Sequence, residues 1–254
     1  MSLMEDRFHR TRLIDWMDMD SVLGSRCLVV GAGALGNEVV KNLALAGMGS
    51  LTLVDMDHVE ISNLNRCVFF REWEEGRPKA EVVAERSSDL SPTEVEPVIS
   101  RVEDLPESVW SEYDLVLGCL DNIAARLHAN GHSYQAGVPY IDGGTHGMFG
   151  KVQVVIPPHT PCLQCGLNRS HFRVLEKRYS CTGGEHTFYE PRVPAEVTTT
   201  SVIAAVQVRE GLKVLSGAKE KCLRHVLYYH GLEGGTETLE MDFDPRCPIH
   251  VDNQ

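Results

Sequence analysis

The chain has 254 residues, of which 43% are hydrophobic and 24% are charged, and its formal net charge is −12 at pH 7. This composition predicts a globular domain with a full core, and the acidic balance argues against a general binder of nucleic acid or anionic membrane. The apolar stretches fall short of the roughly 18 residues of a membrane span. Because the N-terminus also lacks the apolar core of a signal peptide, we expect a cytoplasmic protein.

Residues 1–25 are expected to form an N-terminal helical arm outside any sheet. Arg7, Arg10 and Arg12 lie in this arm, and such arginines ordinarily form a solvated helix face. Residues 26–142 alternate apolar runs with helical patterns. These repeated βα units predict a doubly wound, mostly parallel, Rossmann-like sheet with right-handed crossovers.

The pattern changes in residues 143–254. Glycine-linked apolar runs predict antiparallel hairpin strands that extend the sheet, and the weak periodicity of 166–195 predicts a long crossover loop. A helix is expected over 196–215, with apolar residues at Val202, Ala205, Val206, Leu212 and Leu215. We therefore expect a single domain over 1–254, with a nucleotide-binding βα half in 26–142.

A glycine-rich turn follows the first apolar run. Gly31, Gly33 and Gly36 have the spacing that lets backbone approach a phosphate at a helix N-terminus. Asp55 comes 19 residues after Gly36, which is suitable for binding ribose hydroxyls. The turn alone favours NAD or FAD, but an oxidoreductase would need a substrate unit with its own acid–base pair, and the sequence offers none.

Cationic and amide side chains behind this turn favour a triphosphate over a nicotinamide. Arg66 can bind phosphate in a bidentate manner, Lys79 can act as a point charge, and Asn63 lies between them and the turn. Asp121 ends another apolar run, where a carboxylate can hold Mg²⁺. Each residue alone could equally be a surface charge or a helix cap, so the prediction depends on their joint order.

Two short cysteine motifs predict a metal site. Eight cysteines without a signal peptide favour thiols and metal over disulfides. The pairs Cys162-x-x-Cys165 and Cys247-x-x-His250 together can form a closed four-ligand zinc site. A redox pair, or two unrelated reduced pairs, are the alternatives.

The chain resembles the ThiF/MoeB-type adenylyltransferases that activate ubiquitin-like and sulfur-carrier proteins. The resemblance covers nearly the whole chain and is carried by the following motifs: Gly31–Gly36, Asp55–Asp57, Ser62–Arg66, Gly76–Glu81, Cys119–Asn122 and the C-x-x-C pair. It implies ATP-dependent adenylation of the C-terminal glycine carboxylate of a small β-grasp protein that ends in Gly-Gly. The products would be an acyl-adenylate and pyrophosphate.

The resemblance also assigns site residues. Asp55 would bind ribose, Asn63, Arg66 and Lys79 would surround the phosphates, and Asp121 would hold Mg²⁺. The full nucleotide site would comprise Gly31, Gly33, Gly36, Asp55, Asp57, Asn63, Arg66, Lys79, Asp121 and Asn122. Arg10 matches an arginine that the family inserts into the site of a partner subunit, which implies a homodimer.

Two cysteine assignments are less direct. The family places a reactive cysteine in the general region of Cys181, which could take the acyl group as a thioester or join a persulfide relay; an incidental loop cysteine is the alternative. His250 departs from the second C-x-x-C pair that the family usually has, although imidazole is an acceptable zinc ligand.

Two further functions remain open on the sequence. A non-catalytic partner subunit would keep the fold and would be expected to lack some of Arg10, Asn63, Arg66, Lys79 and Asp121, all of which are present. A related tRNA-modifying dehydratase would adenylate a small carboxylate on RNA, and the acidic charge argues against it.

Overall fold

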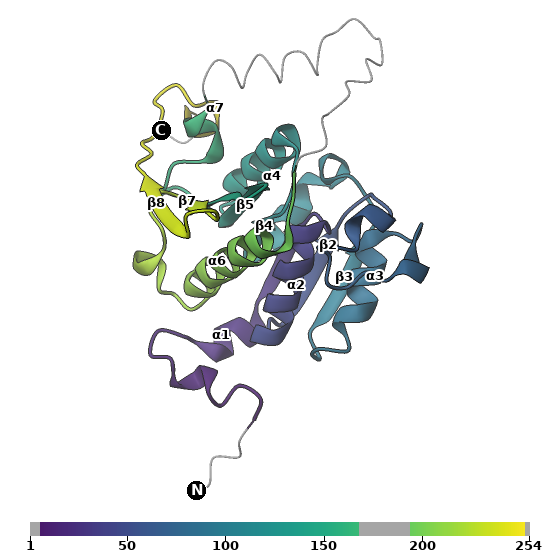
Figure 1. Cartoon of the computed structure of the whole chain (residues 1–254). Coiled ribbons are helices and arrows are strands. Elements are labelled where there is room, and N and C mark those ends of the chain that lie inside the picture. Colours follow the sequence, from purple (N-terminus) through teal and green to yellow (C-terminus); the bar gives the residue numbers. More distant parts are fainter. Residues whose placement is uncertain (1–5, 168–193, 252–254) are drawn as a thin grey trace, which may run out of the picture.

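The structure, a computed structural model, describes residues 6–167 and 194–251, and these form one mixed sheet between two layers of helices (Figure 1). The strand order is β3-β2-β1-β4-β5-β6-β7-β8. Strand pairs from β3 to β5 are parallel, and the pairs from β5 to β8 are antiparallel. The predicted fold class is therefore confirmed. The strands are β1 Arg26–Val30, β2 Ser50–Val54, β3 Glu94–Val98, β4 Leu115–Gly118, β5 Tyr140–His146, β6 Phe149–Val155, β7 Val226–His230 and β8 Gly235–Leu239.

Helices cover both faces of the sheet. The α-helices are α1 Met19–Gly24, α2 Ala34–Ala46, α3 Lys79–Ser87, α4 Ile123–Gln135, α6 Val197–Leu215 and α7 Pro248–Val251. The short 3-10 helices are η1 Thr11–Leu13, η2 Ile61–Asn63, η3 Glu72–Glu74, η4 Val102–Asp104, η5 Glu107–Glu112, η6 Leu163–Gly166 and η7 Lys219–Lys221. One hydrophobic cluster joins α2, α3 and α6 to one face, and a second joins α4, η4 and η5 to the other.

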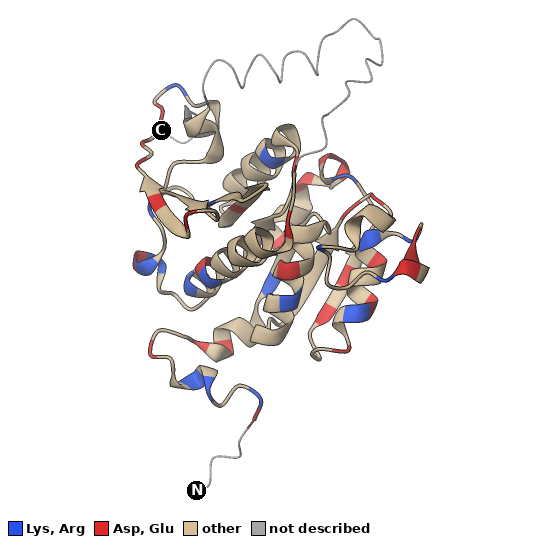
Figure 2. Cartoon of the chain, viewed as in Figure 1, with Lys and Arg blue, Asp and Glu red and all other residues tan. Residues whose placement is uncertain are grey.

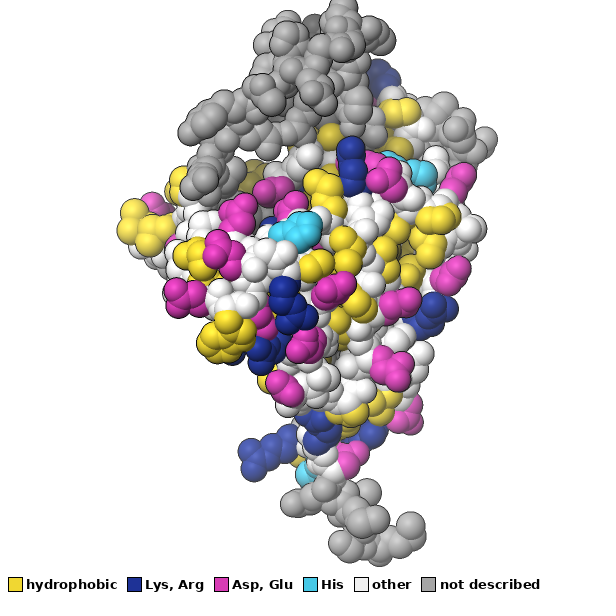
Figure 3. Space-filling model, turned by 90° about the vertical axis from the view of Figure 1, so that its right-hand side faces the viewer, with side chains coloured by type: hydrophobic (Ala, Val, Ile, Leu, Met, Phe, Trp, Pro, Cys, Tyr) yellow, Lys and Arg dark blue, Asp and Glu magenta, His cyan; other side chains and the backbone are white. Residues whose placement is uncertain are grey.

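Strand β1 shows why the sheet needs both layers. Cys27 and Val29 belong to the cluster under α2 and α6, whereas Leu28 and Val30 belong to the cluster under α4. A central parallel strand is buried on both faces, so its sequence is an unbroken apolar run. Strand β3 lies at the edge of the sheet and pairs with β2 alone. An edge strand tolerates Pro97, which lacks a backbone N–H. Figure 3 views this side of the molecule and shows Asp and Glu among hydrophobic side chains.

The N-terminal arm consists of two short pieces rather than one helix. The 3-10 helix η1 is followed by α1, whose first turn is capped by the Asp18 carboxylate. Phe8 packs against Gly47, where an added Cβ would lie 2.5 Å from the phenyl Cζ. Gly47 ends α2, so the arm lies at the amino edge of the parallel strands and carries basic residues there (Figure 2).

Helix α6 buries a polar side chain among its apolar ones. Ile203, Ala204, Val208 and Leu212 are buried, whereas Ala205 is exposed and Val202 and Val206 are half-buried. Gln207 on the buried side has no exposed surface and donates from Nε2 to the carbonyls of Gly118 and Ile141. A polar side chain of this kind cannot be found by counting apolar residues.

The remaining expectations are met with small shifts. The predicted Glu196 start of α6 is its N-cap, and Gly217 follows the helix with a positive φ of 75°. The last two of the expected antiparallel strands are β7 and β8, joined through Gly234, which has a positive φ of 68°. Of the expected crossover loop, residues 168–193 lie outside the described residues. Among the helices of 6–167 and 194–251, none has the length and apolar content to cross a membrane.

Candidate functional site

The carboxyl ends of β1 and β4 define a topological switch point. After β1 the chain builds β2 and β3 on one side, and it then returns to place β4 on the other side. Val30 pairs with Val54 of β2 and with Gly118 of β4, so the segments that follow these strands are neighbours. Open α/β sheets bind ligands in the crevice at this point.

The backbone of the glycine turn lines this crevice. Gly31 has φ +101°, and an added Cβ would lie 2.6 Å from the carbonyl oxygen of Cys119; at Gly36 it would lie 1.8 Å from that of Gly31. At Gly33, the N-cap of α2, an added Cβ would meet no atom of the described residues within 4 Å. The N-terminus of α2 therefore faces open space, and its free N–H groups and positive dipole end suit an anion.

Asp55 holds the turn in this shape. Its Oδ2 accepts from the Ala32 N–H at 2.6 Å, and its Oδ1 accepts from the Asp57 N–H at 2.7 Å. Burial raises the pKa of Asp55, and the two backbone bonds together with Lys79 oppose that rise. Since a carboxylate has about four acceptor positions, Asp55 can hold the turn and still accept a ribose hydroxyl.

Asn37 is a site-building residue that the sequence analysis missed. Its Nδ2 donates to the carbonyls of Ala32 at 2.9 Å and Gly33 at 3.0 Å, and its Oδ1 accepts from the Phe69 N–H at 3.0 Å. It thereby joins the glycine turn to the segment that follows Arg66. The available signal was an amide in the first turn of a helix whose other buried positions are mainly apolar.

The predicted cationic residues gather beside this turn. Lys79, the first residue of α3, is 13% exposed at its side chain and places Nζ 2.9 Å from Asp57 Oδ2. Arg66 donates to the carbonyl of Ser62 at 2.6 Å. Burial raises the pKa of the Cys67 thiol to about 11, and the charges of Arg66, Lys79 and Asp55 also act on it. The Lys79–Asp57 pair lies next to Asp55, because Asp55 Oδ1 accepts from the Asp57 N–H.

Asn63 and Asp121 occupy the two sides of the crevice. Asn63 is buried at the end of η2, and its Oδ1 accepts from the Glu60 N–H at 3.1 Å. Asp121 is exposed after β4. Asn122 then caps α4, because its Oδ1 accepts from the Ala124 N–H at 2.9 Å. An exposed carboxylate at the switch point can serve as a Mg²⁺ ligand.

A buried ionic cluster beneath Asp121 was also missed by the sequence analysis. Asp142 on β5 is fully buried and bonds to Arg126 of α4 through both carboxylate oxygens, and Lys151 Nζ lies 3.6 Å away. Burial would raise the pKa of Asp142, but the charges of Arg126 and Lys151 outweigh it and leave the pKa below its usual value. The ion pair of Arg126 and Asp142 attaches the first turn of α4 to β5. Asn122 and Asp121 directly precede that turn, so the ion pair also fixes their positions.

The structure does not bring every predicted residue to this crevice. Arg10 is exposed in the arm, and that arm packs against Gly47 at the far end of α2. Because a helix of 13 residues is about 20 Å long, Arg10 lies at the opposite edge from its own chain's glycine turn. Cys181 lies outside the described residues.

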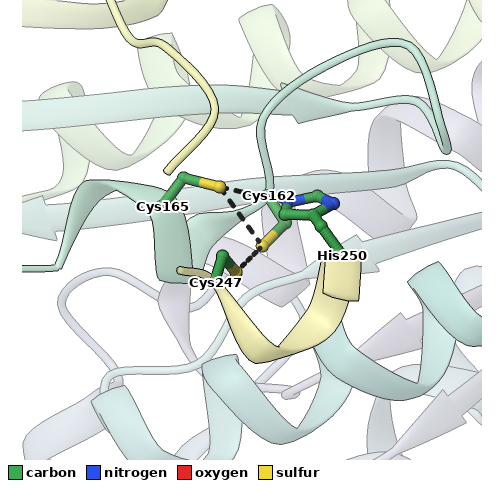
Figure 4. Close-up of side chains that lie close together, drawn as sticks. All are labelled: Cys162, Cys165, Cys247 and His250. Atoms are coloured by element: carbon green, nitrogen blue, oxygen red, sulfur yellow. Dashed lines mark hydrogen bonds between the residues drawn. The ribbon is translucent and has the colours of Figure 1, made fainter. Parts of the chain in front are cut away.

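The predicted metal ligands converge elsewhere (Figure 4). The Sγ atoms of Cys162 and Cys165 are 3.9 Å apart, those of Cys162 and Cys247 are 3.6 Å apart, and Cys165 Sγ lies 3.1 Å from His250 Nε2. All four ligand atoms lie within 4.8 Å of one another. Sulfur ligands of a tetrahedral zinc ion, bonded at about 2.3 Å, lie about 3.8 Å apart. The residues present therefore fit zinc.

The fold is that of a doubly wound α/β domain whose switch point presents the open N-terminus of α2. The model of the ThiF family matches residues 7–249. The chain belongs to the ThiF family, which confirms the resemblance inferred from its motifs.

Relatives and solved structures agree with this assignment. The chain is 31% identical to the sulfur carrier protein adenylyltransferase of Thermus thermophilus, over 96% of this chain and 90% of that protein. It is 30% identical to the NEDD8-activating enzyme E1 catalytic subunit of Arabidopsis thaliana, over 88% of this chain and 65% of that protein. The chain spans only 36% of the Drosophila melanogaster protein of the same description. The structure of E. coli MccB with ATP shares the fold, with a TM-score of 0.79 at 19% identity over 98% of this chain and 74% of that chain.

The ion pair of Arg126 and Asp142 gives a stability prediction. Arg126→Met should lower the free energy of unfolding by about 3–5 kcal/mol at pH 7, because it leaves a buried carboxylate short of a partner. In the wild type the folded pKa of Asp142 is lowered, so the pair's contribution is present at neutral pH and is lost as pH falls through that pKa.

Urea denaturation at several pH values tests this prediction. The difference between the wild type and Arg126→Met should shrink as the pH is lowered towards 4, because the unpaired carboxyl is then neutralised. The double variant Arg126→Met/Asp142→Asn, which removes both charges, is the control and should be more stable than Arg126→Met alone at pH 7. A loss below about 1 kcal/mol for Arg126→Met would contradict the assigned role of the pair.

Proposed function

We propose that this protein is an adenylyltransferase that activates the C-terminal glycine carboxylate of a ubiquitin-like or sulfur-carrier protein. The observation that carries the proposal is the open N-terminus of α2 at the switch point, beside which Asp55 holds the glycine turn and Lys79 pairs with Asp57. The relatives named as NEDD8-activating and sulfur-carrier enzymes support this substrate class. A β-grasp protein ending in Gly-Gly is the expected partner.

The reaction follows from the groups in the crevice. An oxygen of the substrate carboxylate attacks the α-phosphorus of ATP, the bond from that phosphorus to the bridging oxygen breaks, and pyrophosphate leaves with the electron pair. The attacking carboxylate is already ionised at neutral pH, so no side-chain base is required. Catalysis then depends on positioning and on charge stabilisation.

Each residue has a role in this scheme. The N–H groups at Gly33 and α2 receive phosphate, and Asp55 accepts a ribose hydroxyl. Lys79, now paired with Asp57, and Arg66 contact the phosphates. Asn63 orients the loop that carries Arg66. Asp121 would hold Mg²⁺, which neutralises charge on the departing pyrophosphate when bound.

The cluster of Cys162, Cys165, Cys247 and His250 would hold a structural zinc ion. Four protein ligands close such a site, so it offers no position for substrate. The ligands come from η6 and α7, which both contact α4. Zinc would therefore attach the C-terminal segment to the nucleotide-binding half, within the single adenylation domain that we propose for 1–254.

Arg10 supports a homodimer in this proposal. The arm holds it at the edge opposite to its own chain's crevice, so a second copy of the chain is the natural recipient of this cation. An arginine that stabilises phosphate charge in trans is a known catalytic device.

Exchange of labelled pyrophosphate into ATP tests the adenylation step. We expect exchange only in the presence of a carrier protein ending in Gly-Gly, and a loss of at least 100-fold in Asp121→Ala, since metal-ion stabilisation of the phosphates is worth several kcal/mol. Asp89 is an exposed acid that follows α3 in the chain. Asp89→Ala is therefore the matched control and should retain exchange. Absence of exchange with every such carrier would refute the proposal.

Mixing two inactive variants tests the action of Arg10 in trans. Arg10→Ala and Asp121→Ala should each be inactive, but mixed dimers contain one complete site, so random re-assortment should restore about a quarter of the wild-type exchange rate. If Arg10 acts within its own chain, mixing restores nothing. Size-exclusion chromatography with light scattering establishes in parallel that the variants form dimers.

Cys181 remains a proposed acceptor of the acyl group. If it forms a thioester, a thiol-sensitive adduct with the carrier protein should accumulate with ATP, and Cys181→Ala should abolish it. Non-reducing gel electrophoresis with and without a thiol reductant measures the adduct, and Cys222→Ser is the control because Cys222 is buried after η7. An adduct that persists in Cys181→Ala would show that this thiol is a bystander.

A further inference from the structure

Helix α4 carries polar side chains at every fourth residue. Asn122, Arg126, Asn130 and Tyr134 follow one another at this spacing, which places them along one side of the helix. Asn122 lies at the crevice described above, and Arg126 belongs to the buried ionic cluster with Asp142. The other two, Asn130 and Tyr134, lie at the end near the metal ligands and have no role in the proposed reaction.

Asn130 is fully buried and faces the first ligand pair. Its Oδ1 accepts from the Leu163 N–H at 3.0 Å, inside the segment between Cys162 and Cys165. Its Nδ2 has no hydrogen-bond partner among the described residues. A buried N–H₂ group without an acceptor costs about 1–3 kcal/mol, and a metal-bound thiolate would provide that acceptor.

Tyr134 faces the second ligand pair. Its hydroxyl lies 2.9 Å from Nδ1 of His250, and the two rings meet edge to face with centroids 4.7 Å apart. The other ring nitrogen, Nε2, points at Cys165 Sγ. When Nδ1 carries the proton and donates it to the Tyr134 hydroxyl, Nε2 has the free lone pair that ligates a metal.

We infer that Asn130 and Tyr134 are positioning residues for the metal site, one for the segment that holds Cys162 and Cys165 and the other for the imidazole of His250. The inference rests on the zinc site of the proposed function. Zn²⁺ with three thiolates and a neutral imidazole carries a net charge of −1, and Cys162 and Cys247 are both almost fully buried. Donors beside the sulfurs reduce the cost of burying that charge.

The pairing of Tyr134 with His250 is specific to an imidazole ligand. A cysteine in place of His250 has no second polar atom for the hydroxyl to contact. Tyr134 therefore matters because this chain has histidine as the fourth ligand. The same helix side then connects the zinc site to Asn122, about 18 Å away along α4.

Zinc affinity in single variants tests the inference. Tyr134→Phe and Asn130→Ala should each weaken zinc binding by about 10–100-fold, the usual effect of losing an outer partner of a metal ligand. Asn130→Asp keeps the acceptor for Leu163 but replaces the donor with a negative charge, so we expect an even larger loss. Competition with a chromophoric chelator, using the full chain and zinc alone, measures the affinity.

Two controls separate positioning from folding. Ser133→Ala removes a buried hydrogen bond of the same helix, from Oγ to the Val138 carbonyl at 2.8 Å, without touching the ligands, and should leave zinc affinity unchanged. In the His250→Cys background, Tyr134→Phe should have no further effect on zinc affinity. The melting temperature of the metal-free chain should be the same for the wild type and Tyr134→Phe.

The outcomes distinguish the two proposals. A wild-type chain that binds no zinc overturns both the metal site and this inference. A wild type that binds zinc while Tyr134→Phe and Asn130→Ala bind it within twofold as tightly leaves the metal site standing and overturns the positioning roles. Equal losses from Tyr134→Phe in the wild-type and His250→Cys backgrounds would assign the effect to helix packing and would likewise overturn the role of Tyr134.

Discussion

The carboxylate of Asp55 is the contact on which the candidate site depends. Asp55 directly follows β2, and its Oδ2 accepts from the N–H of Ala32 in the glycine turn after β1. The carboxyl ends of the two neighbouring strands are thereby held together. The second oxygen of Asp55 accepts from Asp57, whose own carboxylate pairs with Lys79 of α3. This half-buried acid thereby holds the glycine turn, Asp57 and Lys79 in fixed relation. The N-terminus of α2 that stays open is suited to an anion.

Helix α4 connects the candidate site to the segments that contain the cysteine and histidine ligands. Asn122 caps it beside Asp121, and Arg126 fixes its first turn to the buried Asp142. Farther along, Asn130 and Tyr134 contact the segments that hold the cysteine and histidine ligands. Both ends of the helix are therefore held by polar contacts in buried surroundings, where hydrogen bonds and ion pairs are strong and their loss is costly.

The residues that the sequence analysis missed share one physical property. Asn37, Asp142 and Gln207 are polar side chains with no exposed surface, and each has hydrogen-bond partners in distant elements. Asn37 joins α2 to the segment near Phe69, and Gln207 joins α6 to β4 and β5. Local spacing does not reveal such partners. The row of polar residues on α4 was not predicted to be buried, because polar residues at helical spacing usually form a solvated face.

The sequence by itself determined the order of βα units, the glycine turn, the acids at the strand ends and the two ligand pairs, because these depend on local patterns and on side-chain chemistry. It thus predicted the doubly wound sheet and the family. Only the tertiary structure decided that Asp55 holds the turn, that Arg10 lies at the edge opposite to its own crevice, and that cysteine and histidine ligands 85 residues apart in sequence meet. Such contacts depend on strand pairing and helix packing across the whole chain, which no single stretch of sequence encodes.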